Sequence, residues 1–190
     1  MFAGTAAVNA EDYTWKFVTA GDATTYAIRS DGSLWSWGWN EKGQGGNGVS
    51  ERTATPTLAD GNRVWKKAVG GKAYGFFLAE DGSLWAAGTH EGGVQGTNDG
   101  IDHKVLTRIG TDNDWADMAC FRFWGDSGFA IKTNGTLWAW GKNSAGQLGI
   151  GNTQAQTAPV QVGADMDWKQ VAAGCSSVLA LKTDGSLWGW

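Results

Sequence analysis

The sequence predicts an all-β fold built from repeats, and three observations lead to that prediction. The pentapeptide Asp-Gly-Ser-Leu-Trp begins at positions 31, 81 and 184, and a near-copy, Asn-Gly-Thr-Leu-Trp, begins at position 134. A tryptophan that opens an apolar stretch keeps the same period, at Trp15, Trp65, Trp115 and Trp168. The apolar residues fall in short runs without helical periodicity. A period of about fifty residues is typical of stacked repeat architectures.

The unit that begins at Trp168 shows the expected strands most clearly. Residues 168–174 and 178–182 are short runs rich in strand-forming residues, and 187–190 form a third. The Asp-Gly pair before the third run suits a two-residue hairpin turn, because it tolerates the positive φ angles that such a turn needs.

A fourth strand is visible in the preceding unit. A loop punctuated by glycine over 141–152 leads to an extended run over 158–162. We expect Pro159, and its counterpart Pro56, at the start of this fourth strand, where a missing N–H is tolerated at a sheet edge.

Four short strands in each unit favour a β-propeller in which every unit is one blade. We divide the chain into a leader over 1–10 and propeller repeats over 11–190. The units are 11–60, 61–110, 111–163 and a partial unit, 164–190, which gives about 3.75 repeats and fifteen strands. The last blade then presents an apolar face with Trp188 and Trp190. We expect a protein partner, or further copies of the same chain, to pack on this last repeat.

Composition excludes several classes of protein. The net charge is −4 and Lys and Arg are not concentrated anywhere, which argues against a nucleic-acid partner. No apolar stretch is long enough for membrane insertion, and the first ten residues lack the features of an intact secretion signal. The two cysteines, Cys120 and Cys175, fall in corresponding strands of successive units. Stacked sheets lie too far apart for a disulfide, so we expect two free, buried thiols.

One longer string carries a resemblance to a known family. Residues 134–151 read Asn-Gly-Thr-Leu-Trp-Ala-Trp-Gly-Lys-Asn-Ser-Ala-Gly-Gln-Leu-Gly-Ile-Gly, and 31–48 keep much of the same string. The chain resembles the regulator of chromosome condensation repeat in its bacterial and phage form, over about residues 11–190. This resemblance implies a seven-bladed propeller, of which fifteen strands would supply only part.

The departures from that family matter for function. Family units carry a histidine before the second strand, where this chain has Thr24, Tyr74, Gly128 and Ser177, so no ring of histidines can form. The eukaryotic namesake is a nucleotide exchange factor that acts through an inserted wedge and acidic loops. This sequence has no matching insertion, so the resemblance does not carry exchange activity over.

The search for catalytic chemistry gives no complete constellation. His90 beside Glu91, and His103 beside Asp102, could act as acid–base pairs, but both lie in glycine-rich loops where solvated polar residues are expected. Cys175 lacks an adjacent cation and is interpreted as a structural thiol. We therefore predict no enzyme activity and no cofactor.

Short polar residues recur three positions before each opening tryptophan: Asp12, Asn62, Asp112 and Asp165. Carboxylates on one edge could hold calcium, which requires six to eight oxygen ligands. The favoured interpretation is an Asx turn, in which the side chain binds its own backbone, because the four residues do not share a charge. We predict no metal site.

The tryptophans of the pentapeptide could form a sugar-stacking platform or part of the core. We expect Trp35, Trp85, Trp138 and Trp188 to be largely buried, because blades cover both faces of a propeller strand. Trp39 and Trp124 break the repeat pattern and are the best candidates for exposed aromatic contacts. Together with His90, Glu91 and Asn143 from the variable loops, they form the predicted binding set.

Two functional classes remain. The first is a non-catalytic structural scaffold that binds a protein or a glycan, in an extracellular setting on a cell surface or virion. The second is a regulatory propeller acting on a small GTPase, or a cryptic hydrolase. The loops vary and their polar residues do not converge in the sequence, which favours the scaffold.

Overall fold

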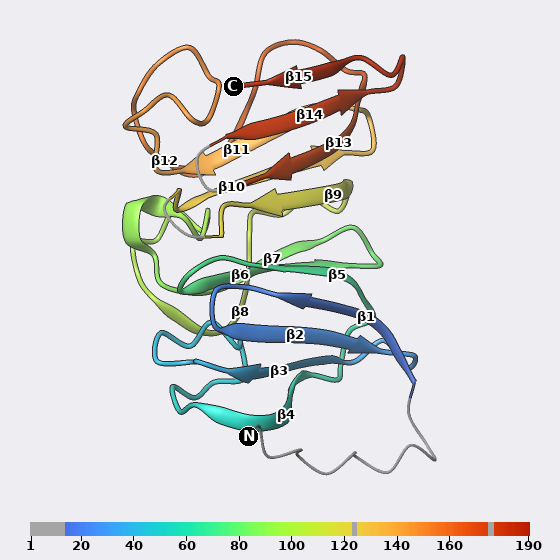
Figure 1. Cartoon of the computed structure of the whole chain (residues 1–190), viewed down its shortest axis with the longest axis vertical. Helices are drawn as coiled ribbons and strands as arrows, with labels where there is room; N and C mark the ends of the chain where they lie inside the picture. Colours follow the sequence, from blue (N-terminus) through green and yellow to red (C-terminus); the bar gives the residue numbers. More distant parts are fainter. Residues whose placement is uncertain (1–13, 123–124, 175–176) are drawn as a thin grey trace, which may run out of the picture.

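The computed structural model describes residues 14–122, 125–174 and 177–190, and Figure 1 shows them as a stack of four antiparallel sheets. The leader predicted over 1–10 lies outside these residues. The first sheet holds β1 (Trp15–Ala20), β2 (Thr24–Arg29), β3 (Leu34–Gly38) and β4 (Thr53–Asp60). The second holds β5 (Trp65–Gly70), β6 (Tyr74–Ala79), β7 (Leu84–Gly88) and β8 (His103–Arg108). The third holds β9 (Trp115–Cys120), β10 (Ser127–Lys132), β11 (Leu137–Gly141) and β12 (Gln156–Gln161), and the fourth holds β13 (Trp168–Ala173), β14 (Val178–Lys182) and β15 (Leu187–Gly189).

The predicted fold is confirmed, because every described sheet is antiparallel with its strands in chain order. The fifteen strands of the described residues are those counted from the sequence, and each opening tryptophan begins the first strand of its sheet. The only helical element described is the 3-10 turn η1 (Glu91–Gly93). No helix in the described ranges has the length and apolar character that crossing a membrane requires.

The hydrophobic core lies between successive sheets, as expected for stacked blades. Tyr26 of the first sheet and Phe77 of the second meet edge to face with ring centroids 5.2 Å apart. Phe76 of the second sheet and Trp140 of the third are 5.1 Å apart, and all four rings are fully buried. Phe129 of the third sheet and Val171 of the fourth share a further buried cluster, so each of the two middle sheets packs on both of its neighbours.

The hairpin between the second and third strands differs from the prediction. Lys182 donates its N–H to the carbonyl of Ser186, and Gly185 donates to the carbonyl of Lys182, so the loop has three residues rather than two. Only the glycine adopts a left-handed conformation, with φ of 88°. Asp184 instead uses Oδ1 to accept the N–H of Ser186 at 2.8 Å. The aspartate is thus selected as an acceptor and not for positive φ.

Two further expectations are corrected. Pro56 and Pro159 lie inside β4 and β12 and not at their starts; both strands are sheet edges, so the missing N–H costs no ladder bond. Trp35, Trp85 and Trp138 are only half-buried, and Trp188 is 52% exposed. These indoles meet the opening tryptophan edge to face and donate N–H to the Ser or Thr hydroxyl two residues earlier, as Trp85 does to Ser83 at 2.8 Å. At the edge of the stack, these indoles contact a polar group and a second indole and are not buried between two sheets.

Candidate functional site

The long loops after β3, β7 and β11 lie along one edge of the stack, on the left in Figure 1. We call this edge the rim; it also carries the short connections from β5 to β6 and from β9 to β10. Two of the long loops are held by an asparagine. Asn40 Oδ1 accepts the N–H of Gly45 at 2.7 Å, and Asn143 Oδ1 accepts the N–H of Leu148 at 2.9 Å.

Asn143 therefore shapes its loop rather than facing a ligand. Its side chain is fully buried and donates to the carbonyl oxygens of Asn152 and Gln154 at 2.9 and 3.0 Å. The predicted role as a contact residue is corrected on this ground, because the side-chain amide is used inside the loop.

The loop of the second unit is built differently, because His90 replaces the asparagine. The ring Nδ1 lies 2.6 Å from Asp102 Oδ1, and that oxygen also accepts the backbone N–H of His90 at 2.9 Å. Burial raises the pKa of Asp102, but these hydrogen bonds from His90 outweigh it and leave the pKa below its usual value. His103 Nε2 pairs with Asp99 Oδ2 at 2.7 Å. The pairs suggested by adjacency in the sequence, His90 with Glu91 and His103 with Asp102, are therefore not the pairs that form.

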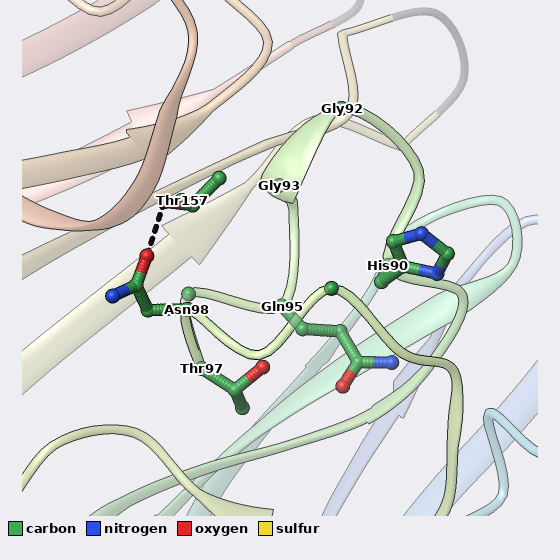
Figure 2. Close-up of a pocket in the computed structure, with 9 residues that line it drawn as sticks. His90, Gly92, Gly93, Gln95, Thr97, Asn98 and Thr157 are labelled. Carbon is green, nitrogen blue, oxygen red and sulfur yellow. Dashed lines mark hydrogen bonds between the residues drawn. The ribbon is translucent and has the colours of Figure 1, made fainter.

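Figure 2 shows a small pocket beside this loop, with a volume of about 90 Å³. Asn98 Oδ1 accepts the hydroxyl of Thr157 at 2.6 Å and so ties the loop to β12 of the third sheet. The remaining lining residues are His90, Gly92, Gly93, Gln95, Gly96, Thr97 and Gly100. This pocket is several times smaller than ligand sites of roughly 300–1,000 Å³, so it is too small for a ligand of drug size.

A larger cavity lies on the rim where three units meet, and we call it the rim hollow. Its volume is about 340 Å³, and its lining residues are Trp39, Lys42, Lys72, Ala73, Thr89, Glu91, Asp126 and Lys142. Two members of the predicted binding set, Trp39 and Glu91, thus share one cavity. The sequence alone did not bring them together, because they come from different units.

The rim hollow forms where residues at equivalent positions of three units come together. The N–H groups of Trp39, Thr89 and Lys142 donate to the carbonyl oxygens of Ala23, Ala73 and Asp126 at 2.8, 2.9 and 2.9 Å, so these residues occupy one repeat position. The carbonyl of Trp39 also accepts the hydroxyl of Thr24 at 2.5 Å, and that of Lys142 accepts the hydroxyl of Ser127 at 2.7 Å. Ser127, and not Gly128, is therefore the counterpart of Thr24.

Asp126 is the residue that sequence analysis missed. Its φ of 39° is unusual for a non-glycine residue, and two other units have Ala23 and Ala73 at this position. The carboxylate lies 3.8 Å from Lys142 Nζ. Burial raises the pKa of Asp126. The simultaneous departure of Asp126 and Lys142 from the repeat pattern was the signal that could have found them.

The recurring acidic residues lie at the opposite edge of the stack and bind lysines. Lys132 Nζ lies 2.6 Å from Asp112 and 3.1 Å from Asp114, and 4.9 Å from the ring centroids of both Trp115 and Trp138. Asp165 pairs with Lys182 in the same way, at 2.7 Å. The predicted Asx turn is thus corrected to an ion pair for both aspartates. Asn62 donates its N–H to Asp60, and Asp12 lies outside the described residues.

The other predicted residues have simpler outcomes. Within the described residues, no group of three or more His, Cys, Asp or Glu side chains is placed to hold a metal. Cys120 is a buried free thiol, as predicted, and burial raises its pKa to about 12. Cys175 and Trp124 lie outside the described residues.

The rim hollow is lined by one tryptophan, three lysines and two residues with carboxylates, which are groups suited to binding.

Comparison with known proteins agrees with this architecture. The Regulator of chromosome condensation (RCC1) repeat matches residues 31–78 and 134–181, and a second description of the same repeat matches 15–44. The ultraviolet-B receptor UVR8 of Arabidopsis thaliana is 29% identical over 185 residues, which cover 91% of this chain and 40% of that protein. Human Protein RCC2 is 30% identical over 141 residues, covering 74% of this chain and 17% of its own length.

Solved structures share the fold. Yeast RCC1 (Prp20) bound to Kap60 superposes with a TM-score of 0.80 at 22% identity, covering 94% of this chain and 44% of that one. Prp20p of Saccharomyces cerevisiae, described with its binding properties to Gsp1p and histones, gives 0.74 at 19% identity, covering 84% and 42%. The chain thus spans less than half the length of each of these relatives.

Proposed function

This chain belongs to the regulator of chromosome condensation (RCC1) repeat family, and we propose that it is a non-catalytic propeller that binds a protein partner at its rim. The observation that carries the proposal is the rim hollow. There Trp39, which breaks the repeat pattern, and Glu91, from a variable loop, share one cavity with three lysines from successive units. Loops held by a rigid scaffold are where binding residues concentrate.

The relatives support binding as the general activity. Prp20p is described with its binding to Gsp1p and histones in one structure and is bound to Kap60 in another. Because this chain covers less than half of Prp20, none of those partners is assigned to it. The comparisons give no support to a glycan ligand or to a cell-surface or virion setting, and the proposal includes neither.

A regulatory propeller that acts on a small GTPase is the second candidate. The observation in its favour is the relation to Prp20p, which is described with its binding to Gsp1p. Against it, the sequence contains no insertion like the exchange wedge of the eukaryotic namesake. Addition of the chain to a GTPase loaded with a fluorescent nucleotide separates the two candidates, since only a regulator of exchange accelerates release.

The last sheet offers a second surface for protein. Leu187 is 66% exposed and Trp188 is 52% exposed, and both lie on β15. An apolar patch of this kind marks an interaction surface on a soluble protein. We propose that a protein partner, or a further copy of the same chain, covers it.

Selection of peptides by display on the immobilised chain tests the proposed rim. Rim binding predicts that selected peptides lose affinity on Trp39→Ala and that Glu91→Gln changes their affinity. The control is Lys169→Gln on β13, an exposed residue that is not part of the rim hollow, which should leave binding unchanged. Selected peptides that ignore both rim variants would refute the rim as the binding face.

A further inference from the structure

We propose that the rim hollow is a docking site for an acidic segment of a protein partner. One carboxylate of that segment lies among the ammonium groups of Lys42, Lys72 and Lys142, and an apolar neighbour contacts the indole of Trp39. The inference rests on the proposed function, because it names the chemistry of the partner at the same rim.

The charge of the rim hollow runs against that of the whole chain. The chain carries a net charge of −4, whereas the hollow has three lysines against the two carboxylates of Glu91 and Asp126. Concave sites focus the field of their lining charges, so a local excess of positive charge attracts an anionic segment.

The lysines come from separate loops that the fold brings together. Lys42 follows β3, Lys72 connects β5 to β6, and Lys142 follows β11. Lys142 occupies the position that Trp39 and Thr89 hold in the other two units, so the cation at this position is specific to the third unit. Three cations on three loops can surround a carboxylate from different sides.

The carboxylate of Asp126 offsets part of the positive charge of the rim hollow. Its backbone holds an uncommon φ of 39°, and its carboxylate faces Lys142 at 3.8 Å, which is a loose ion pair. A strained residue of this kind persists where the surroundings impose it and is frequent at binding sites. An incoming carboxylate competes with Asp126 for Lys142, so removal of the Asp126 charge should strengthen binding.

The two carboxylates of the lining also select the kind of anion. A phosphate monoester carries nearly two negative charges at neutral pH and meets more repulsion from Glu91 and Asp126 than a carboxylate does. The volume of about 340 Å³ lies at the small end of ligand pockets, which suits one or two side chains of a peptide. The half-buried indole of Trp39 supplies the apolar surface beside the charges.

The test measures fluorescence anisotropy of a labelled peptide with repeating Glu-Gly-Leu sequence, added to the full chain. Repeating Gln-Gly-Leu is the uncharged control, and inorganic phosphate is added as a competitor. We expect the Glu peptide to bind and the Gln peptide to bind at least about tenfold more weakly. Binding should weaken as ionic strength rises from about 0.01 to about 0.3 M.

Variants of opposite sign locate the site. Lys42→Gln and Lys142→Gln should each weaken binding about threefold, the change expected for one partly exposed charge pair. Asp126→Asn should strengthen binding by a similar factor, and Asn tolerates the positive φ of this position. The exposed Lys169→Gln, which changes net charge equally, is the matched control, and circular dichroism checks that each variant is folded.

Equal affinity for the Glu and Gln peptides would overturn the proposal, and so would a loss of affinity on Lys169→Gln as large as on Lys142→Gln. Displacement of the Glu peptide by inorganic phosphate at constant ionic strength would assign the hollow to phosphate and also contradict the proposal. The display experiment distinguishes failure of the acidic specificity from failure of the proposed function. If display selects neutral peptides that depend on Trp39, the rim remains the binding face and only its acidic specificity falls.

Discussion

The carbonyl oxygen of Gly82 accepts a hydrogen bond from the backbone N–H of Trp115 at 3.1 Å, so the hairpin of the second sheet holds the first strand of the third. The same bond joins Gly32 to Trp65 at 2.9 Å and Gly135 to Trp168 at 3.0 Å. The pentapeptide therefore forms the hairpin turn of its own sheet and also joins that sheet to the next one.

Replacement of Gly82 by alanine should destabilise the fold. Gly82 has φ of 78°, and an added Cβ would lie 2.1 Å from the carbonyl oxygen of Asn113. The control is Gly110→Ala, where φ is 62° but the space around the Cβ is open, so only backbone strain of about 1–2 kcal/mol applies. We expect Gly82→Ala to cost about 2 kcal/mol more than Gly110→Ala in urea unfolding. Equal costs would show that the stacking contact is unimportant.

The carboxylate of Asp81 should make stability depend on pH. Hydrogen bonds from the hydroxyl and the N–H of Ser83 lower the pKa of Asp81 below its ordinary value of 3.8. Its contribution is therefore present above pH 3.8 and is lost as pH falls through the lower folded pKa. Asp81→Asn keeps the acceptor, as Asn134 does for Thr136, and should lose less stability between about pH 5 and about pH 3. Urea midpoints that fall equally in both proteins would contradict this.

Lys132→Met should report on the cation between Trp115 and Trp138. Methionine keeps the apolar contact but loses the attraction of the charge to both rings and to Asp112 and Asp114. These groups are partly exposed, so screening limits the expected cost to about 1 kcal/mol. Added salt should destabilise the wild-type protein more than the variant. Identical salt dependence would mean that the ion pairs contribute nothing measurable.

The exposed β15 face should govern self-association or partner binding. Leu187→Lys adds charge to a surface where Leu187 is 66% exposed and does not disturb the buried core. If copies of the chain cover this face, sedimentation should show an association that rises with concentration and that the variant abolishes. A chain that remains monomeric at high concentration would refute self-association and leave a different protein as the occupant.

The period of the sequence was sufficient to predict the strands. Each opening Trp begins a strand, and the Pro-containing runs form sheet edges, where a missing N–H is tolerated. The half-burial of Trp85 could not be predicted from alternation alone. It depends on the Ser83 hydroxyl that accepts the indole N–H, and on the opening strand that meets it edge to face.

The candidate site was only partly predictable. Trp39 and Glu91 stood out because they depart from the repeat, but only the fold brings them into one cavity with Lys72 and Lys142. Asn143 was misjudged because a polar residue in a variable loop was assumed to face solvent, whereas it ties the loop from inside. Comparison of loop positions across units would have revealed that Asn40 has the same place in its loop.

The most direct test of the rim as the binding face is the indole region of a ¹H–¹⁵N spectrum of the full chain during titration with the Glu-Gly-Leu peptide. The chain has 13 tryptophans, and Trp39→Phe assigns the signal of the rim indole. We predict that the Trp39 signal shifts in proportion to occupancy and that the Trp188 signal, from the far sheet, does not. A shift confined to Trp188, or binding without any change at Trp39, would contradict the rim as the binding face.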